Sequence, residues 1–424
     1  MREMKDSGIS WVGEIPKEWT IMPLYCFYSE RKNKNIFGAE NNLLSLSYGK
    51  VIRKDINTSE GLLPSNYNGY NIVEAGDIII RPTDLQNDKR SLRTGLSKER
   101  GIITSAYIAL KPKNGINSRF YHYLLHTYDI LKVFYNMGNG VRQGLNYDEF
   151  AKLIVYSPSD TEQQRIAEFL DRACGKIDGL KADIQVQIDT LEQYKRSVIT
   201  EAVTHGLNPS APMKGSKVWY GQIPSEWKEL KGKYVFKQRN DRGNNVCLQL
   251  LSPTQKYGVI PQDKYEELTG MNAVKLNDST NYALLKTIHK GDYCISLRSF
   301  QGGFEYSEYE GVVSPAYQVF YPIITIADGY YKYLFKEKGF IDVMNSYTMS
   351  LRDGKNIAFD DFGDTFIPVP PLDEQQEIAD YLDNKCAEIE RIIADKKSQI
   401  ETLDGYKKSL IYEYVTGKKE VYYV

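Results

Sequence analysis

The fold is decided by a stretch that occurs twice, first as Asp160-Thr-Glu-Gln-Gln-Arg-Ile-Ala-Glu-Phe-Leu-Asp171 and again as Pro371-Leu-Asp-Glu-Gln-Gln-Glu-Ile-Ala-Asp-Tyr-Leu-Asp383. Each copy opens a long amphipathic run. The repeat continues in register, and pairs such as Cys174 with Cys386 keep a constant offset of 212 residues. The chain is therefore expected to contain two copies of one long helix.

Both runs carry apolar residues every three or four positions, which is the pattern of a coiled-coil seam. The first helix should begin with Asp160 or Thr161 as its N-cap and end near His205. From Thr161 to Thr204 such a helix would be about 66 Å long. A one-residue slip interrupts the first seam near Ile184 to Ile188, and Lys396 interrupts the second. The expected seam positions are Ile166, Leu170, Ala173, Ile177, Leu180, Ile184, Ile188, Leu191, Tyr194 and Val198, then Ile378, Leu382, Cys386, Ile389, Ile392, Ile400, Leu403, Tyr406 and Leu410.

The repeat extends beyond the helices and covers most of the chain. A Trp-x-Gly-x-Ile-Pro-x-x-Trp box ends at Trp19 and again at Trp227. Gly-Asp followed by an apolar run occurs at residues 76–80 and 291–295, and Arg-x-Gly-x-Asn occurs at 142–146 and 352–356. The expected organisation is a first domain at 1–159, a helical region at 160–206, a second domain at 207–371 and a second helical region at 372–424.

Each domain has the pattern of a mixed α+β fold. In the first, strands are expected within 71–81, 102–110 and 153–156, with a helix at 120–137 whose apolar residues face the sheet. In the second, strands are expected within 252–260, 291–298 and 365–369, with a helix at 330–344. The fold class is thus α+β, with two tandem mixed domains and two long helices.

Connectivity predicts how the helices pair. The first domain precedes the first helix and the second domain follows it, so the second helix returns from the second domain and packs antiparallel on the first. This arrangement gives an internal pseudo-twofold. The alternative is a two-repeat solenoid with parallel helices, but Ile367-Pro-Val-Pro-Pro371 is too short to bring the chain back along such a helix.

Composition sets the protein class. The 424 residues are 42% hydrophobic with a formal net charge of −1, which fits a globular protein of two or three domains. Five scattered cysteines form no CxxC pair and do not indicate a disulfide framework. The N-terminus lacks a signal-type apolar region, and no apolar run approaches the roughly 20 residues of a membrane span. We expect a cytoplasmic location and no membrane partner.

No motif of an enzyme or a resident metal is found. The sequence has no GxGxxG after a strand, no GxxxxGK[ST] and no HExxH. His122 and His126 stand at i, i+4 without a third ligand, so a packed helix face is expected rather than zinc. Asp360, Asp361 and Asp364 are interpreted as a solvated turn rather than a cation site. We expect no catalytic residue and no metal ligand in this chain.

Charge is distributed unevenly between the segments. Residues 1–160 hold 21 Lys/Arg against 17 Asp/Glu, residues 207–372 hold 19 against 18, and the helical remainder holds 14 against 20. The loops at 84–93 and 296–303 are rich in Arg, Asn and Gln and follow the repeated Gly-Asp strand. Arg can bridge guanine O6 and N7, and Asn or Gln can bridge adenine N6 and N7. These loops are therefore hypothesised to read DNA bases.

The duplicated order of these motifs resembles the specificity subunit of type I restriction-modification systems over essentially the whole chain. The resemblance rests on the twin Trp boxes, the twin Gln-Gln-x-Ile-Ala helix starts, and the Gly-Asp run followed by Ala-Tyr in each domain. It implies two target recognition domains that read the halves of a bipartite, asymmetric site in double-stranded DNA. It also implies docking of two methyltransferase (M) subunits that carry S-adenosylmethionine, with motor-nuclease (R) subunits in the full complex. This chain would hold no cofactor itself.

The candidate DNA contacts are polar and basic residues of the loops. Arg142 and Arg352 occupy equivalent repeat positions, which favours a shared phosphate contact, whereas Arg93 and Gln301 are candidates for base reading. Two alternatives remain open: a coiled-coil adaptor that binds proteins and no DNA, and, less favoured, a single-chain methyltransferase, for which no Asn/Asp-Pro-Pro-Tyr/Phe box exists. The full set of candidates is Arg81, Asn87, Lys89, Arg93 and Arg142 in the first domain, and Arg298, Gln301, Arg352 and Asn356 in the second.

Overall fold

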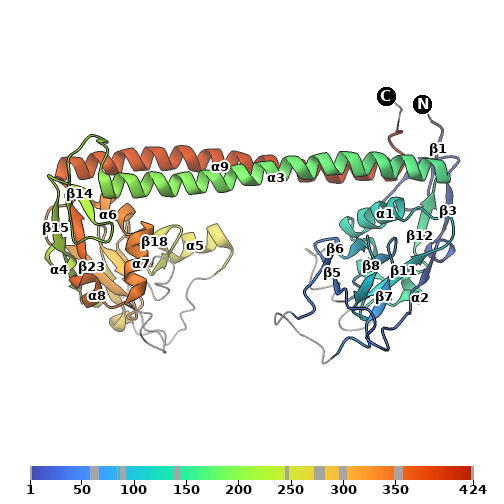
Figure 1. Cartoon of the computed structure of the whole chain (residues 1–424), viewed down its shortest axis with the longest axis horizontal. Helices are drawn as coiled ribbons and strands as arrows, with labels where there is room; N and C mark the ends of the chain where they lie inside the picture. Colours follow the sequence, from blue (N-terminus) through green and yellow to red (C-terminus); the bar gives the residue numbers. More distant parts are fainter. Residues whose placement is uncertain are drawn as a thin grey trace. The chain divides into compact units, whose positions relative to one another are not determined.

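The computed structural model describes residues 2–57, 66–83, 85, 92–137, 144–243, 248–271, 282–295, 303–347 and 357–421. The chain divides into two compact units (Figure 1). Unit 1 comprises Met1–Ile184 with Ser398–Val424, and unit 2 comprises Gln185–Lys397. The division falls inside both long helices, so each unit combines one of the domains expected from the repeat with parts of both helical regions.

Unit 1 is built around a four-stranded antiparallel sheet with the order β4-β11-β8-β9. Four two-stranded ladders, β1–β2, β3–β12, β5–β6 and β7–β10, complete its β-structure among the described residues. The elements are β1 (Met4–Asp6), β2 (Glu14–Pro16), β3 (Thr20–Pro23), η1 (Leu24–Cys26), β4 (Tyr28–Glu30), β5 (Leu44–Ser47), β6 (Lys50–Arg53), β7 (Asn71–Val73), β8 (Ile78–Ile80), β9 (Thr94–Leu96), β10 (Gly101–Ile103), β11 (Ile108–Pro112), α1 (Ser118–Ile130), η2 (Val133–Asn136), α2 (Tyr147–Phe150) and β12 (Ile154–Ser157).

The apolar face of α1 forms the core of unit 1 against the sheet. Phe120, Leu124 and Tyr128 are fully buried, as is Ile78 on β8. The Asn117 side chain caps α1 by accepting hydrogen bonds from the backbone amides of Arg119 and Phe120. The helix ends earlier than the pattern predicts, because the chain enters a left-handed conformation and a 3₁₀ turn after Ile130.

Unit 2 repeats this sheet as β16-β23-β20-β21, with the same order and the same antiparallel pairings. Its ladders are β13–β14, β15–β24, β17–β18 and β19–β22. The elements are β13 (Met213–Gly215), β14 (Gln222–Pro224), β15 (Lys228–Lys231), α4 (Gly232–Val235), β16 (Phe236–Arg239), β17 (Leu251–Thr254), β18 (Gly258–Pro261), α5 (Gln262–Thr269), η3 (Tyr282–Leu284), β19 (Lys286–Ile288), β20 (Tyr293–Ile295), β21 (Phe304–Tyr306), β22 (Gly311–Val313), β23 (Gln318–Pro322), α6 (Asp328–Leu334), α7 (Lys338–Ser346), α8 (Phe359–Asp364) and β24 (Phe366–Val369).

The single helix predicted at 330–344 is two helices. The Glu337 side chain accepts the Phe340 amide and caps α7, so the periodic pattern continues while the backbone breaks. The predicted turn at Asp360–Asp364 is also helical. Asp361 accepts the Ala358 amide at 3.1 Å, and Asp364 pairs with lysines of β15 and α4.

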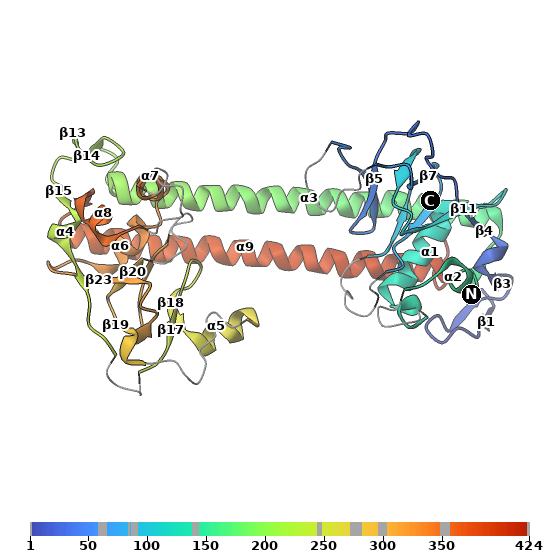
Figure 2. The ribbon, with the colours of Figure 1, turned by 90° about the horizontal axis from the view of Figure 1, so that it is seen from below.

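The long helices are α3 (Asp160–His205) and α9 (Leu372–Val415). Within unit 1, Lys407 Nζ donates to Asp178 Oδ1 at 2.6 Å, and Lys181 pairs with Asp404. Residue numbers rise on one helix as they fall on the other, so the pair is antiparallel. Unit 2 shows the same direction through the pairs Lys195 with Glu390 and Gln187 with Lys396, and the two ribbons lie side by side within each unit in both views (Figure 2). The predicted antiparallel coiled coil is confirmed, and the parallel solenoid is wrong.

Details of the helices differ from the sequence expectation. The first free amides of α3 are bonded to Ser159, so the cap precedes Asp160. Leu180, Tyr194 and Tyr406 were expected in the seam but are 53%, 48% and 58% exposed. Other expected seam residues are buried, among them Leu170, Ile188 and Leu382 at 0%, 1% and 0% exposure.

The repeated helix-start motif is explained by its contact with the Trp box. Trp19 Nε1 donates to Glu162 Oε2 at 3.0 Å, and Trp227 Nε1 donates to Glu374 Oε2 at 2.8 Å. The glutamine that follows each glutamate donates its amide to a proline carbonyl just before the helix. The box and the helix start thus form one duplicated joint between domain and helix.

Candidate nucleic-acid interface

Two loops leave the sheet of unit 1 at the same edge. β4 and β8 are both antiparallel to β11, so they run in the same direction. Their last residues, Glu30 and Ile80, lie opposite Leu110 and Ile108 near the start of β11. The segments that follow, 31–43 and 81–93, therefore start from one edge, and the second is the loop predicted to read DNA.

Unit 2 has the same arrangement. β16 and β20 are both antiparallel to β23, and they end at Arg239 and Ile295. The segments after these strands, 240–250 and 296–303, start from the corresponding edge. The duplication therefore preserves the positions from which the loops depart, while the loop sequences differ.

A buried ion pair supports the start of each first loop. Asp77 is fully buried, accepts the Arg31 guanidinium at 2.9 Å and also accepts the Glu74 amide at 2.8 Å. Burial raises the pKa of Asp77, and the Arg31 guanidinium acts in the opposite direction. The pair explains why the repeated motif carries an aspartate after its glycine.

The equivalent pair in unit 2 joins Arg239 to Asp292. The guanidinium bonds both carboxylate oxygens, at 2.7 and 3.0 Å, and Asp292 accepts the His289 amide at 2.9 Å. In the sequence, Arg31 and Arg239 are basic residues at the starts of these loops. Both guanidiniums are instead committed to carboxylates inside the protein, so they hold the loops in place.

Arg93 lies inside the protein and not on its surface. Its side chain is fully buried, and the guanidinium bonds the Thr83 carbonyl and, at 3.2 Å, the Tyr135 hydroxyl. The Arg93 amide donates to Asp129, a buried carboxylate on α1 whose pKa is raised mainly by burial. Because Thr83 and Arg93 stand at the two ends of the loop, this side chain braces the loop across its base. The burial contradicts the base-reading role expected from the sequence.

Arg81 is the other candidate within the described residues. It is half-buried, directly follows β8, and its amide donates to the Arg93 carbonyl at 2.9 Å. It stands at the start of the 81–93 loop, and its contact with DNA stays a prediction. The remaining candidates lie outside the described residues: Asn87, Lys89, Arg142, Arg298, Gln301, Arg352 and Asn356.

Residues next to these candidates converge on the same edges. The Leu145 amide donates to the Pro82 carbonyl at 3.0 Å, so the chain just after 138–143 lies beside the start of the 81–93 loop. In unit 2, the Gln318 side chain, at the start of β23, bonds the backbone of Ile357 and Phe359. In each unit, the sheet edge therefore gathers the flanks of both candidate segments.

The histidines expected on a packed helix face lie there. His122 and His126 are on α1 with ring centroids 6.0 Å apart, and burial lowers the pKa of His122 to about 3. Among the described residues, no group of three or more His, Cys, Asp or Glu side chains could hold a metal ion. No helix in this part of the chain is both long and apolar enough to cross a bilayer.

Comparison with known proteins identifies the duplicated unit. The family model for the type I restriction modification DNA specificity domain matches residues 30–190 and again residues 223–402. A curated protein of Methanocaldococcus jannaschii, named as the specificity subunit of the type I restriction enzyme MjaX, is 22% identical over 429 residues, which cover 97% of this chain and 96% of that protein.

A solved structure shows the same fold. A chain from a study of complex assembly and conformational transition in the type I R-M system aligns with a TM-score of 0.66 at 13% identity, covering 96% of this chain and 99% of that one. The HsdS subunit from Thermoanaerobacter tengcongensis aligns with a TM-score of 0.48 at 13% identity, over 96% of this chain and 98% of that one. With its two matched segments, the chain belongs to the family of type I restriction modification DNA specificity domains.

Proposed function

We propose that this chain is the DNA sequence-recognition subunit of a type I restriction-modification complex, in which each domain reads one half of a bipartite site. The observation that carries the proposal is the conserved pair of loop positions at one sheet edge of each unit, combined with unlike loop sequences. Two identical domains related by a twofold would read a palindrome. An identical frame with different loops reads two different half-sites, so the full site is asymmetric.

The internal ion pairs support this proposal, because they hold the loops in place before DNA binds. Arg31 with Asp77, and Arg239 with Asp292, fix the first loop of each unit, and Arg93 braces the second loop of unit 1. Loops held in this way lose less conformational entropy on binding, which favours affinity and discrimination. Direct contacts with DNA then come from loop residues other than these paired arginines, beginning with Arg81 in unit 1.

The long helices have a separate role in the proposal. They dock two M subunits, which bind S-adenosylmethionine and carry out the methylation, and they set the number of base pairs between the half-sites. R subunits join for cleavage, and this chain supplies no catalytic group. Large apolar side chains that are exposed on the helices support docking: Leu180 and Tyr406 in unit 1, and Val186 and Tyr194 in unit 2. Side chains of this kind are favoured at the centres of protein interfaces.

Methylome sequencing tests the function directly. The chain is co-expressed with its M subunit in cells that lack other methyltransferases, and methylated adenines are mapped. The proposal expects one asymmetric, two-part motif, which disappears when this chain is omitted. The purified complex should then bind a duplex carrying that motif at least 1,000-fold more tightly than a scrambled duplex, in the usual range for specific DNA binding. A complex that assembles but binds no DNA would instead support the coiled-coil adaptor.

A further inference from the structure

The segment between β4 and β5 carries an apolar tip. Phe37 is 93% exposed and its neighbour Ile36 is 63% exposed. A single exposed apolar side chain is normal and needs no explanation. Here two adjacent ones stand in a segment that is otherwise polar and basic, Arg31-Lys-Asn-Lys-Asn35 followed by Ile36-Phe37.

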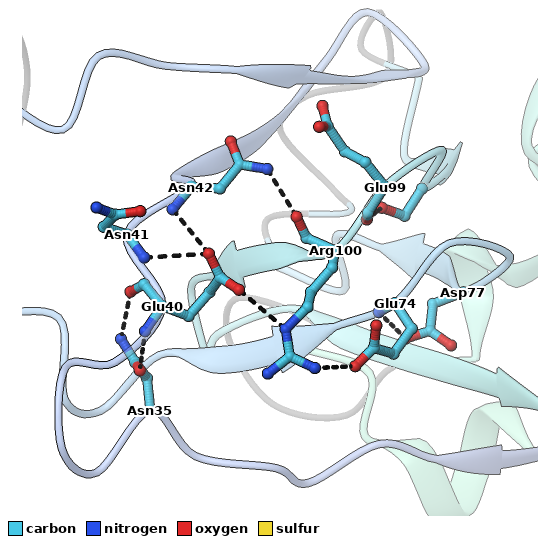
Figure 3. A network of polar contacts seen from close by, with 9 residues as sticks. Asn35, Glu40, Asn41, Asn42, Glu74, Asp77, Glu99 and Arg100 are labelled. Carbon is cyan, nitrogen blue, oxygen red and sulfur yellow. Dashed lines mark hydrogen bonds and ion pairs between the residues drawn. The ribbon is translucent and has the colours of Figure 1, made fainter.

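A network of hydrogen bonds holds this tip in place (Figure 3). Asn35 is buried, and its side-chain amide bonds both the carbonyl and the amide of Glu40, at 2.9 and 3.1 Å. The four residues between them are thereby closed into a loop, and the Gly38 amide adds a bond to the Asn35 carbonyl at 3.0 Å. The Asn35 amide in turn bonds the Tyr70 carbonyl and fixes the loop to the domain.

Glu40 extends the network on the far side of the tip. Its carboxylate accepts the amides of Asn41 and Asn42, both at 3.1 Å, and the Arg100 guanidinium at 2.9 Å. These bonds lower the pKa of Glu40, with the Asn42 amide as the largest cause. Arg100 also bonds Glu74 at 2.6 Å, which ties the tip to the turn before β8 (Figure 3). Phe37 thus projects from a braced loop.

The tip starts from the same sheet edge as the predicted reading loop, because β4 and β8 end together. Isolated bridges bound its segment, Lys34 to Asn71 and Leu43 to Ile102. Unit 2 has matching bridges, Arg242 to Lys286 and Leu250 to Val312. The strands and bridges that flank this segment are therefore the same in both units, and the residues between them differ.

The residues within the two segments differ in chemical type. At the offset that relates Arg31 to Arg239, the sequence has Asn244 and Asn245 in place of Ile36 and Phe37. Those two asparagines lie outside the described residues, so only their identity is compared. At that offset, the sequence of the second domain therefore lacks the Ile-Phe pair.

The surroundings favour a polyanion as the partner. Residues 31–39 contain three basic side chains and no acidic one, although Arg31 is paired with buried Asp77. Lys32 is 73% exposed and pairs with Glu30 at 2.7 Å, and Lys34 donates to the Gly69 carbonyl at 3.0 Å. On the other side of the tip, the Glu40 carboxylate is paired with Arg100. Basic and amide groups around a rigid apolar tip are the combination with which proteins insert a wedge against DNA bases.

We propose that Phe37, backed by Ile36, presses against bases of the first half-site and partly unstacks one base step. This inference rests on the proposed function and assigns the contact to residues outside the predicted reading loops. A wedge has to be rigid to unstack bases, and the hydrogen-bond network supplies that rigidity. The contact would help the first domain to prefer a deformable step.

The test uses the whole complex of this chain with its M subunits, on the duplex identified from the methylome. 2-Aminopurine is placed at successive positions of each half-site, and its fluorescence reports unstacking. We expect wild-type complex to raise the signal at one step of the first half-site, and Phe37→Ala to abolish that rise and weaken binding about 5- to 100-fold. Phe37→Trp should retain both effects.

Two controls separate a specific contact from general damage. Tyr25 is 50% exposed in η1, at the opposite end of β4, so Tyr25→Ala should leave binding and fluorescence unchanged. 2-Aminopurine at the methylated adenine should still respond in every variant, because the M subunit takes that base out of the stack.

Other results would overturn the wedge. Unchanged fluorescence and affinity in Phe37→Ala would remove Phe37 from the interface. Loss of M subunits from purified Phe37→Ala, with DNA unaffected, would make the tip a protein contact. Failure of the proposed function is distinguishable, because the wild-type complex would then bind no duplex and yield no methylated motif.

Discussion

The duplicated joint between the Trp box and the helix start allows one experiment to be run twice within one chain. Trp19→Phe and Trp227→Phe each delete an indole N–H and part of a fully buried ring. The free-energy cost of the space that the smaller ring leaves unfilled is similar at both sites, on the order of 1 kcal/mol. The two variants differ in the hydrogen-bond partners that remain for the glutamate carboxylate.

Glu162 keeps a strong partner after Trp19→Phe, because Arg2 donates to both of its oxygens, at 2.5 and 2.9 Å. For Glu374, the one hydrogen bond found among the described residues comes from Trp227. Losing a bond to a charged group costs about 1.5 to 3 kcal/mol, against roughly 0.5 to 1.5 for an ordinary bond. Trp227→Phe should therefore be more destabilising than Trp19→Phe by about 1 kcal/mol.

The pH dependence has a definite sign. Burial raises the pKa of Glu374, while the Trp227 bond lowers it. A group whose pKa is raised by folding contributes stability below its usual pKa, and that contribution is lost as the pH rises through the raised value. Removing the indole N–H raises the pKa further. The cost of Trp227→Phe should therefore be smaller at about pH 4 than at neutral pH.

Amide hydrogen exchange at the first turns of α3 and α9 measures both joints in the same sample. The double variant Arg2→Ala, Trp19→Phe serves as the matched control and should bring the first joint to the cost of the second. Equal loss of protection for the two single variants would refute the reasoning, as would a cost of Trp227→Phe that does not change with pH.

Three further predictions concern the loops and their supports. Burial raises the pKa of Glu305 to about 7 against the lowering effect of Lys336, so its stabilising contribution should disappear as the pH rises through about 7. Glu305→Gln should remove that pH dependence in urea unfolding, and an unchanged profile would contradict the assignment. Asp129→Ala, which strips the buried acceptor from the Arg93 and Thr94 amides, should destabilise unit 1 by about 3 kcal/mol and increase proteolysis within 81–93. Arg81→Ala should weaken DNA binding and flatten the slope of log K against log salt by about 0.9, checked by titration at several salt concentrations.

The sequence predicts the large-scale organisation well, because repetition and periodicity are local signals. A constant offset of 212 residues identifies both helices, and the short segment before the second helix dictates their antiparallel pairing. The break at Glu337 is not visible in the same way. Apolar residues continue at helical spacing across it, and only the cap of α7 reveals the change of direction.

The candidate site was harder to predict, because its supports join residues far apart in sequence. Arg31 lies 46 residues from Asp77 and Arg93 lies 36 from Asp129, so a basic residue in a loop looks the same whether it is paired or free. Burial decides between these possibilities. The tip at Ile36 and Phe37 is visible in the sequence as two apolar residues inside a basic, amide-rich loop. It is not among the candidates, because these were chosen for side chains that can form hydrogen bonds.

The composition of unit 1 has a consequence for synthesis. Its core includes Leu410, Ile411 and Val415 of α9, packed with Ile166 and Leu170 of α3, which precede them by more than 200 residues. Unit 2 ends at Lys397, before that segment is translated. The ribosome therefore completes the chain of the second unit first, and the core of the first unit stays incomplete until Leu410, Ile411 and Val415 are synthesised. The usual order of N-terminal folding before C-terminal folding is reversed, and termination before Leu410 would leave unit 1 exposed to aggregation or proteolysis.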